Sequence, residues 1–175
     1  MKKVVVLIII FTAMNLLSQT NTQRIKVGHS FDISVPNIMM RTYTLVEGAK
    51  LQFQNGVKNI YLIVLDESKE ELKGLGVVCN NVEDYYETIT KDYQTNYKNY
   101  KQISKRNINN NGYKIIQTEY QYTGGDLAKA IEIYFCQDYV ETEKYFYKVA
   151  CWTTPENIEK LGPLMREISK SIKED

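Results

Sequence analysis

Residues 128–152 read AKAIEIYFCQDYVETEKYFYKVACW, and this stretch decides the fold. Apolar and polar residues alternate from Ile131 to Phe135, and aromatic or β-branched residues dominate from Tyr145 to Trp152. Both patterns are typical of β-strands. The polar connection at 141–143 carries no helix signal, so the stretch predicts two antiparallel strands joined by a short loop.

Two further strand regions precede this hairpin. Residues 31–35 alternate and are followed by Pro36, which predicts an edge strand because proline cannot donate to the ladder. Asn55-Gly56 favours a two-residue type I′ turn between two apolar runs. Residues 60–65 are apolar throughout, so they predict a central strand that is covered on both faces.

A first helix is predicted at about 82–100. Asn81 is a suitable N-cap ahead of acidic residues in the first turn, and the apolar positions that follow are spaced by three or four. Many of these positions are tyrosine. Because tyrosine is enriched at binding sites, Tyr93, Tyr97 and Tyr100 form a candidate contact surface. Packing of the helix on a sheet, with the hydroxyls at the rim, explains the same stripe without a ligand.

A second helix is predicted at about 155–173, because Thr154 and Pro155 are favourable at the N-cap and the first helical position. Gly162-Pro163 predicts a kink or a division into two pieces. Between the helices, residues 113–122 alternate and predict a strand. Turns are expected at 107–112 and at 123–126, where asparagine and glycine are frequent.

The N-terminal residues 1–22 are typical of a signal peptide. Two lysines follow Met1, and Val4 to Leu17 is an uncharged run of about 14 residues, shorter than the roughly 20 that span a bilayer. We therefore expect an exported protein, periplasmic or extracellular, with one domain at 23–175. No stable membrane insertion is expected after cleavage.

The charge of the exported chain is close to neutral. Removing Lys2 and Lys3 from 22 basic residues leaves 20 against 21 acidic residues, a formal net charge of about −1. Basic and acidic residues alternate along the chain, so no charge-driven partner and no nucleic acid is predicted.

The sequence contains few residues that could serve in catalysis or bind a metal. His29 is the single histidine, which rules out a zinc site built from several imidazoles, and we expect it in a solvent-facing loop. Glu119 and Glu132 are a conceivable acid and base pair, but each lies at a polar phase of a strand and is expected to face water. No catalytic residue, metal or cofactor is assigned.

A disulfide between Cys136 and Cys151 depends on the register of the central hairpin. If Thr142 lies opposite Tyr145, the two cysteines are direct neighbours, and a slip of one residue places them on opposite faces. The alternation favours the slipped register, because it puts Phe135 on the same face as the cysteine of the second strand. The disulfide is therefore a candidate that this register argues against.

The order of motifs resembles the PsbP-like family over about residues 30–173. The resemblance rests on FDISVP, LQFQNGVKNIYLIVLDE, the capped tyrosine-rich helix, NGYKIIQTEYQY and the YFYKVACWTTPE junction. It implies an α/β fold, an α/β/α sandwich with a largely antiparallel sheet and flanking helices. The family includes photosystem II extrinsic subunits, DcrB-type exported proteins and secretion chaperones, so the resemblance implies non-catalytic binding or assembly.

We therefore expect an exported, non-catalytic binding or assembly module that contacts another envelope protein or a small ligand. The alternative is a hydrolase that uses only carboxylates, such as a glycosidase, which needs two acidic groups about 5 to 10 Å apart in a cleft.

Overall fold

A large antiparallel sheet is the centre of the fold in the computed structural model, which describes residues 21–28, 30–125 and 130–174. Within these residues, its strand order is β3-β4-β5-β9-β8-β7-β6, and all neighbours are antiparallel. A second, small sheet has the order β1-β2-β10. The strands are β1 (Thr22–Val27), β2 (Phe31–Pro36), β3 (Met40–Arg41), β4 (Leu51–Asn55), β5 (Ile60–Ser68), β6 (Lys98–Asn110), β7 (Tyr113–Gly124), β8 (Ile131–Glu141), β9 (Tyr145–Thr153) and β10 (Lys173–Glu174).

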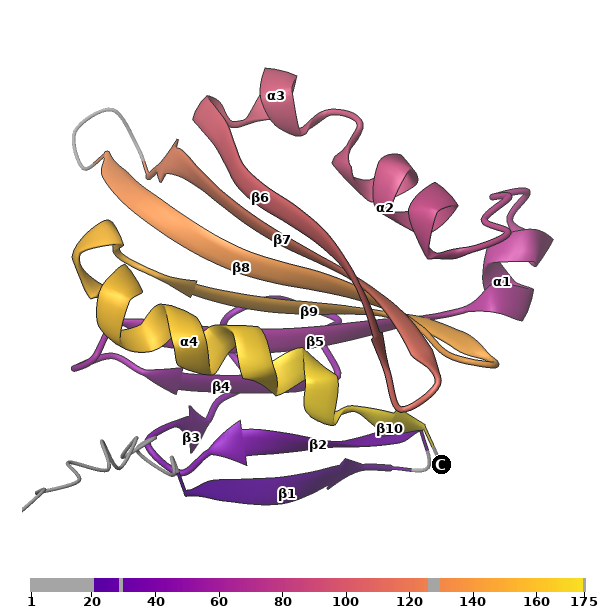
Figure 1. Ribbon diagram of the computed structural model, residues 1–175, viewed down its shortest axis with the longest axis horizontal. Coiled ribbons are helices and arrows are strands. Elements are labelled where there is room, and N and C mark those ends of the chain that lie inside the picture. Colours follow the sequence, from indigo (N-terminus) through magenta and orange to yellow (C-terminus); the bar gives the residue numbers. More distant parts are fainter. Residues whose placement is uncertain (1–20, 29, 126–129, 175) are drawn as a thin grey trace, which may run out of the picture.

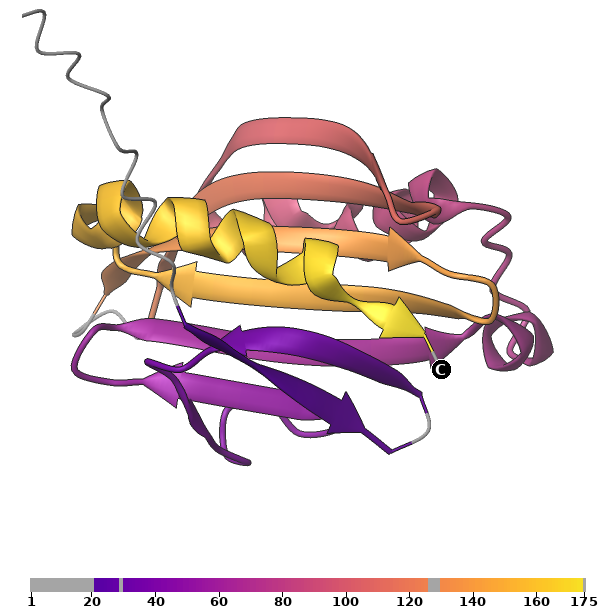
Figure 2. The ribbon, with the colours of Figure 1, turned by 60° about the horizontal axis from the view of Figure 1, so that its bottom comes forward.

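Helices and the small sheet cover the two faces of the large sheet (Figures 1 and 2). The helical segments are α1 (Lys69–Gly74), α2 (Val82–Thr90), α3 (Tyr93–Asn96), η1 (Pro155–Asn157), α4 (Ile158–Ile168) and η2 (Ser169–Ser171). We call the side with α4 and the small sheet the α4 face, and the side with α2 and α3 the α2 face. The predicted α/β fold with a largely antiparallel sheet and flanking helices is confirmed. The layer on the α4 face is part helix and part sheet, which was not predicted.

The central hairpin forms as predicted. The Thr142 amide donates to the Tyr145 carbonyl over 3.0 Å, and the Thr142 hydroxyl accepts from the Tyr145 amide over 3.1 Å, which closes the loop between β8 and β9. β5 lies between β4 and β9, so the prediction that 60–65 is an interior strand is confirmed. Leu62 and Val64 of β5 are fully buried against the α4 face.

The favoured register of this hairpin was wrong. Cys136 lies opposite Cys151, and Phe135 lies opposite Trp152 on the α2 face. The alternation of apolar and polar residues gave the wrong register because both faces of the large sheet are covered, so an apolar residue can lie on either face. Tyr134 instead points to the α4 face, where its hydroxyl has a buried carboxylate partner. Both cysteines are buried free thiols in this structure.

The first predicted helix is shorter than expected. Asn81 accepts a hydrogen bond from the Asp84 amide, so the predicted N-cap is confirmed. α2 ends at Thr90, whose hydroxyl donates to the carbonyl four residues earlier, an interaction that competes with helix continuation. α3 adds one turn and β6 then begins, so Tyr97 and Tyr100 do not lie on a helix.

The second predicted helix is confirmed from Pro155 onward as η1, α4 and η2. α4 continues through Gly162-Pro163 instead of dividing there. Thr154 makes no side-chain cap; its hydroxyl donates to the Glu156 carboxylate. The helical segment ends at Ser171, and Lys173, the last residue of the predicted helix, begins β10.

Two smaller predictions also need correction. The chain between β4 and β5 is a four-residue loop instead of an Asn55-Gly56 turn: Asn55 pairs with Ile60, and its side chain accepts from the Lys58 amide. β2 is not an edge strand, because β1 pairs with it on one side and β10 on the other. Of the turn expected at 107–112, only Asn111-Gly112 forms a turn, with φ of 52° and 83°, and residues 107–110 belong to β6.

Part of the N-terminal prediction lies outside the described residues. This holds for His29 and for residues 1–20 of the expected signal peptide, while β1 begins at Thr22, next to the expected domain boundary. In the described ranges, no helix combines the length and hydrophobicity needed to cross a bilayer.

The burial of the hairpin cysteines predicts a selective thiol response. In the native protein only Cys79, which is half-buried, should react readily with a thiol reagent, because Cys136 and Cys151 are each 1% exposed. After denaturation without reductant, we expect three reactive thiols. Titration of a single thiol in the denatured protein would instead establish a Cys136–Cys151 disulfide.

Candidate functional site

Five tyrosines gather on the α2 face where α3 leads into β6. The predicted contact residues Tyr93, Tyr97 and Tyr100 do lie together: the ring centroid of Tyr93 is 4.8 Å from that of Tyr97 and 6.1 Å from that of Tyr100. Tyr120 and Tyr122 of β7 complete the group, and Tyr97 stacks on Tyr122 at 4.4 Å. We call these five residues the tyrosine cluster. All except Tyr120 are only partly buried.

A β-bulge at the start of β6 brings Tyr97 and Tyr100 to one side. β6 pairs with β7 at Lys98 and again at Lys101, and one extra residue of β6 fits between these pairs. Asn99 adopts a φ of 56°, a left-handed conformation that asparagine tolerates better than most residues. Residues three apart on a regular strand point to opposite faces, and the extra residue reverses this. The cluster therefore depends on an irregular strand that the helix prediction missed.

Stacked rings continue from the cluster across the sheet. Tyr122 stacks on Phe135 and Phe135 on Trp152, each at 5.5 Å, and Trp152 stacks on Tyr61 at 5.3 Å. We call Tyr122, Phe135, Trp152 and Tyr61 the aromatic strip; they come from the adjacent strands β7, β8, β9 and β5. Each ring is only partly buried. An aromatic pair of this kind contributes about 0.5–1.5 kcal/mol beyond the burial of its area.

A buried glutamine binds two hydroxyls of the cluster. Gln137 accepts from the Tyr120 hydroxyl over 2.7 Å and donates from its amide nitrogen to the Tyr93 hydroxyl over 3.0 Å. Burial raises the pKa of Tyr97 and of Tyr100 to about 12 and raises the pKa of Tyr120 well above its usual value. The hydroxyls therefore stay protonated at neutral pH and can donate hydrogen bonds.

A hollow of about 270 Å³ opens beside the cluster, between the α2–α3 segment and β6. The rings of Tyr86, Tyr93 and Tyr100 line it together with the polar groups of Lys91, Gln94 and Gln102. Aromatic faces next to amides and one cation suit a polar ligand group or a side chain of a partner.

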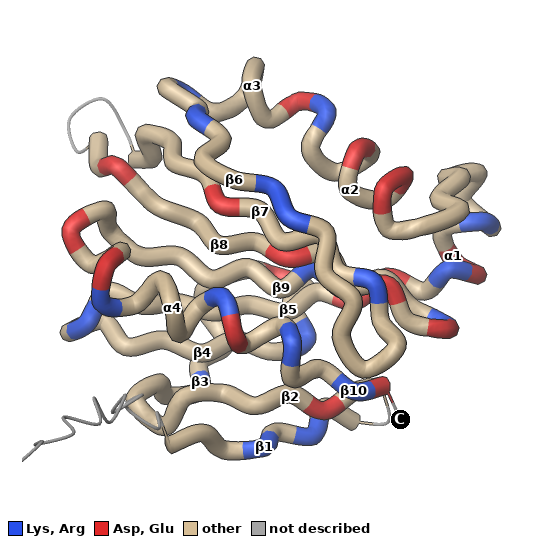
Figure 3. Tube along the Cα trace, viewed as in Figure 1, with Lys and Arg blue, Asp and Glu red and all other residues tan. Residues whose placement is uncertain are grey.

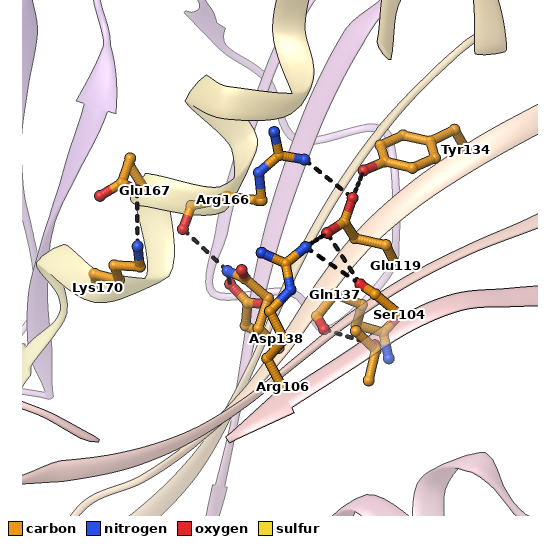
Figure 4. A network of polar contacts seen from close by, with 11 residues as sticks. Ser104, Arg106, Glu119, Tyr134, Gln137, Asp138, Arg166, Glu167 and Lys170 are labelled. Carbon is orange, nitrogen blue, oxygen red and sulfur yellow. Dashed lines mark hydrogen bonds and ion pairs between the residues drawn. The ribbon is translucent and has the colours of Figure 1, made fainter. Parts of the chain in front are cut away.

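On the α4 face, Glu119 is the centre of a buried polar network (Figure 4). One carboxylate oxygen accepts from the Ser104 hydroxyl over 3.0 Å and from Arg106. The other accepts from Arg166 of α4 over 3.0 Å and from the Tyr134 hydroxyl. Glu119 is 5% exposed, so the prediction that it faces water was wrong. Two guanidinium groups from distant segments compensate its charge, which strand periodicity does not reveal.

The network keeps Glu119 ionised. Burial alone would raise the pKa of Glu119, but hydrogen bonds from Tyr134 and Ser104 and the charges of both arginines outweigh burial and lower it. Glu132 is exposed, as predicted. Glu119 lies opposite Cys136, four residues along β8 from Glu132, which is a separation of roughly 13 Å. The two carboxylates therefore do not face one another.

A second buried carboxyl lies next to this network. Asp138 is 1% exposed; one oxygen accepts from the Gln117 amide over 3.2 Å, and the other has no hydrogen-bond partner. Burial raises the pKa of Asp138 to about 7. The Ser169 and Gln117 side chains and the charge of Lys170 oppose this shift, while the charge of Glu119 adds to it.

Other candidate chemistries have little support in the described part of the chain. No three His, Cys, Asp or Glu side chains come together there as a metal site would require. Burial raises the pKa of Cys136 and of Cys151 well above the usual range, so neither thiol is ionised at neutral pH.

The Glu119 network predicts that replacing Glu119 destabilises the protein much more than replacing Glu132 on the same face. Glu119→Ala should lower the free energy of unfolding by about 2 kcal/mol, because it leaves two guanidinium groups without their carboxylate. The loss is smaller than for a fully buried pair, since Arg106 is 48% exposed. The exposed matched control Glu132→Ala should change stability by less than about 0.5 kcal/mol. Urea unfolding measures both, and equal losses would contradict this role for Glu119.

The buried Asp138 predicts a pH-dependent effect of Asp138→Asn. Between the unfolded pKa of about 4 and the native pKa of about 7, the native state holds a proton that the unfolded state releases. Wild-type stability therefore falls as pH rises through this window, and asparagine avoids this loss. The stability of the variant relative to wild type should increase by about 3 kcal/mol from pH 4 to pH 8. A difference that stays constant across this range would show that Asp138 does not titrate in it.

Sequence comparison finds no relative: no protein family and no curated protein matches the chain. Solved structures do match it. The solution structure of cyanobacterial PsbP (CyanoP) from Synechocystis sp. PCC 6803 has a TM-score of 0.61 at 13% identity, covering 89% of this chain and 94% of that chain.

Two further structures match over most of their length. LpqN, involved in cell envelope biogenesis of Mycobacterium tuberculosis, has a TM-score of 0.54 at 7% identity and covers 88% of this chain and 90% of that chain. PA94 from Pseudomonas aeruginosa, a protein of unknown function and putative regulator, has a TM-score of 0.52 at 11% identity, with 83% and 92% covered. These identities carry information on fold alone, and they support the PsbP-like fold that the order of motifs resembles.

Proposed function

We propose that this chain is an exported, non-catalytic binding module, a single PsbP-like domain at 23–175 that contacts another envelope protein. The observation that carries the proposal is the continuous set of rings in the tyrosine cluster and aromatic strip, which are all partly buried except Tyr120. Tyrosine and tryptophan are enriched in protein interfaces and dominate their binding energy. Packing within the fold accounts for the buried side of each ring, and a partner would cover the rest.

The arrangement of the α2 face supports this use. α2 packs on β7 and β8 and α3 on β6, whereas Trp152 and Tyr61 belong to β9 and β5. Gln137 holds the hydroxyls of Tyr93 and Tyr120 in place before any partner arrives, which lowers the entropic cost of binding. The hollow lined by Tyr86, Tyr93 and Tyr100 is of a size for one side chain of the partner.

Export is supported by two observations. Residues 1–22 have the composition of a signal peptide, and the fold is shared with cyanobacterial PsbP and with LpqN, a protein involved in cell envelope biogenesis. An envelope protein is the partner class that follows from this location.

The carboxylate-only hydrolase is less well supported. Glu119 and Asp138 are buried carboxyls on the α4 face, but four donors hold the two oxygens of Glu119, and Asp138 is only 1% exposed. Neither residue lines the hollow at the tyrosine cluster. An acid and base pair needs access to water and substrate.

The proposal is tested by affinity capture of the mature protein from its own cell envelope, followed by mass spectrometry. The double variant Tyr97→Ser/Tyr100→Ser should lower recovery of the partner at least tenfold, because interface tyrosines often contribute about 2 kcal/mol or more. Tyr97→Phe/Tyr100→Phe retains the rings and should recover more partner than the serine variant.

Tyr43→Ser is the matched control, since Tyr43 is 74% exposed beside β3, at the opposite edge of the sheet from β6. Circular dichroism checks that each variant is folded. Repeated recovery of no partner, together with turnover of a glycan or ester substrate, would overturn the proposal.

A further inference from the structure

The sheet edge next to the tyrosine cluster is strongly basic. No Asp or Glu occurs between Asp92 and Glu119, and β6 carries four basic residues, Lys98, Lys101, Lys105 and Arg106. Figure 3 shows Lys and Arg but no Asp or Glu along β6. The expectation that basic and acidic residues alternate along the whole chain fails for this segment.

Much of this charge has no internal partner. Arg106 is paired with Glu119, and the Lys105 ammonium lies 3.9 Å from the centre of the Tyr86 ring, which does not cancel its charge. No carboxylate of the described residues forms an ion pair with Lys98 or Lys101. Both side chains are exposed, so their charge is available to a partner.

β6 also has a free hydrogen-bonding edge. It is the last strand of the large sheet, and Figure 2 shows it outermost. Its pairing with β7 is regular from Ser104 to Asn110. Apart from this ladder, no backbone hydrogen bond among the described residues involves 101–110. The outward amide and carbonyl groups of this seven-residue run can pair with another strand.

We propose that β6 binds an extended acidic segment of the partner protein, which adds to the sheet as an antiparallel or parallel strand. Backbone hydrogen bonds along 104–110 would supply affinity, and acidic side chains of the segment would select for the lysines. The proposal rests on the proposed function, because β6 begins at the tyrosine cluster and one partner can reach both.

Charge decides between occupants of this edge. A second copy of the chain would place its own four basic residues against these four, and like charges on paired strands are destabilising. Lysines on an edge strand can also serve only to prevent pairing with other chains. If that were their role here, β6 would bind no peptide segment. An anionic polymer would bind the lysines but would form no backbone hydrogen bonds with β6.

Selection from a display library of random twelve-residue peptides on the mature protein tests the proposal. The enriched peptides should contain an excess of Asp and Glu that alternates with β-branched or aromatic residues. Lys98→Glu/Lys101→Glu should weaken the best peptide at least tenfold. The matched reversal Lys58→Glu/Lys160→Glu, at exposed lysines outside β6, should change its affinity less than twofold.

Backbone pairing is tested on the same peptide. N-methylation of every second amide in one phase should abolish binding, and methylation in the other phase should not, because only one set faces β6. Bound peptide should slow amide hydrogen exchange at 104–110. The proposal is overturned by enrichment without acidic residues, by no enrichment, or by equal binding of both methylated forms. Failure here with tyrosine-dependent capture intact would reject strand addition and leave the binding role standing.

Discussion

The pairing of β8 with β9 is the constraint on which the rest of the structure depends. Because side chains alternate between faces, placing Cys136 opposite Cys151 determines the side on which every other residue of both strands lies. Tyr134 and Asp138 then point towards α4, and Phe135 and Gln137 point towards α2. A slip of β8 by one residue would turn the Asp138 carboxyl away from the Gln117 amide that donates to it, and it would separate Phe135 from Trp152. One register thus creates both the polar network and the aromatic strip.

The two faces of the large sheet are stabilised by different kinds of contact. On the α4 face, Arg166 of α4 and Arg106 of β6 meet at Glu119, so one carboxylate joins the C-terminal helix to the edge of the sheet. A buried ion pair of this kind adds little net stability, but it disfavours other positions for the helix. On the α2 face the tyrosine cluster and the aromatic strip consist of rings and neutral hydroxyls, which tolerate both burial and exposure.

Most strands of the large sheet and the starts of the two predicted helices, at Asn81 and Pro155, could be predicted from local sequence, because propensity and capping act within a few residues. Asn81 and the 60–65 run are examples. The end of α2 could not, because tyrosines at 93, 97 and 100 fit a helical stripe equally well, and local sequence does not reveal that the bulge at Asn99 places Tyr100 on the edge strand β6. Glu119 was also misplaced, since its arginine partners are 13 and 47 residues away in the chain. The grouping of Tyr93, Tyr97 and Tyr100 was anticipated, whereas the contribution of Phe135 and Trp152 required the strand order.

The position of β5 in the sheet has a kinetic consequence. β6, β7, β8 and β9 are consecutive in the chain and pair as successive hairpins, but Tyr61 of β5 meets Trp152 of β9 across 91 residues. Closing a loop of that length costs more entropy than forming a hairpin and slows folding. We therefore expect the four-strand meander to form before β5 docks on it. The Tyr61 end of the aromatic strip is then among the last parts to assemble, so a newly made chain would complete the strip only at the end of folding.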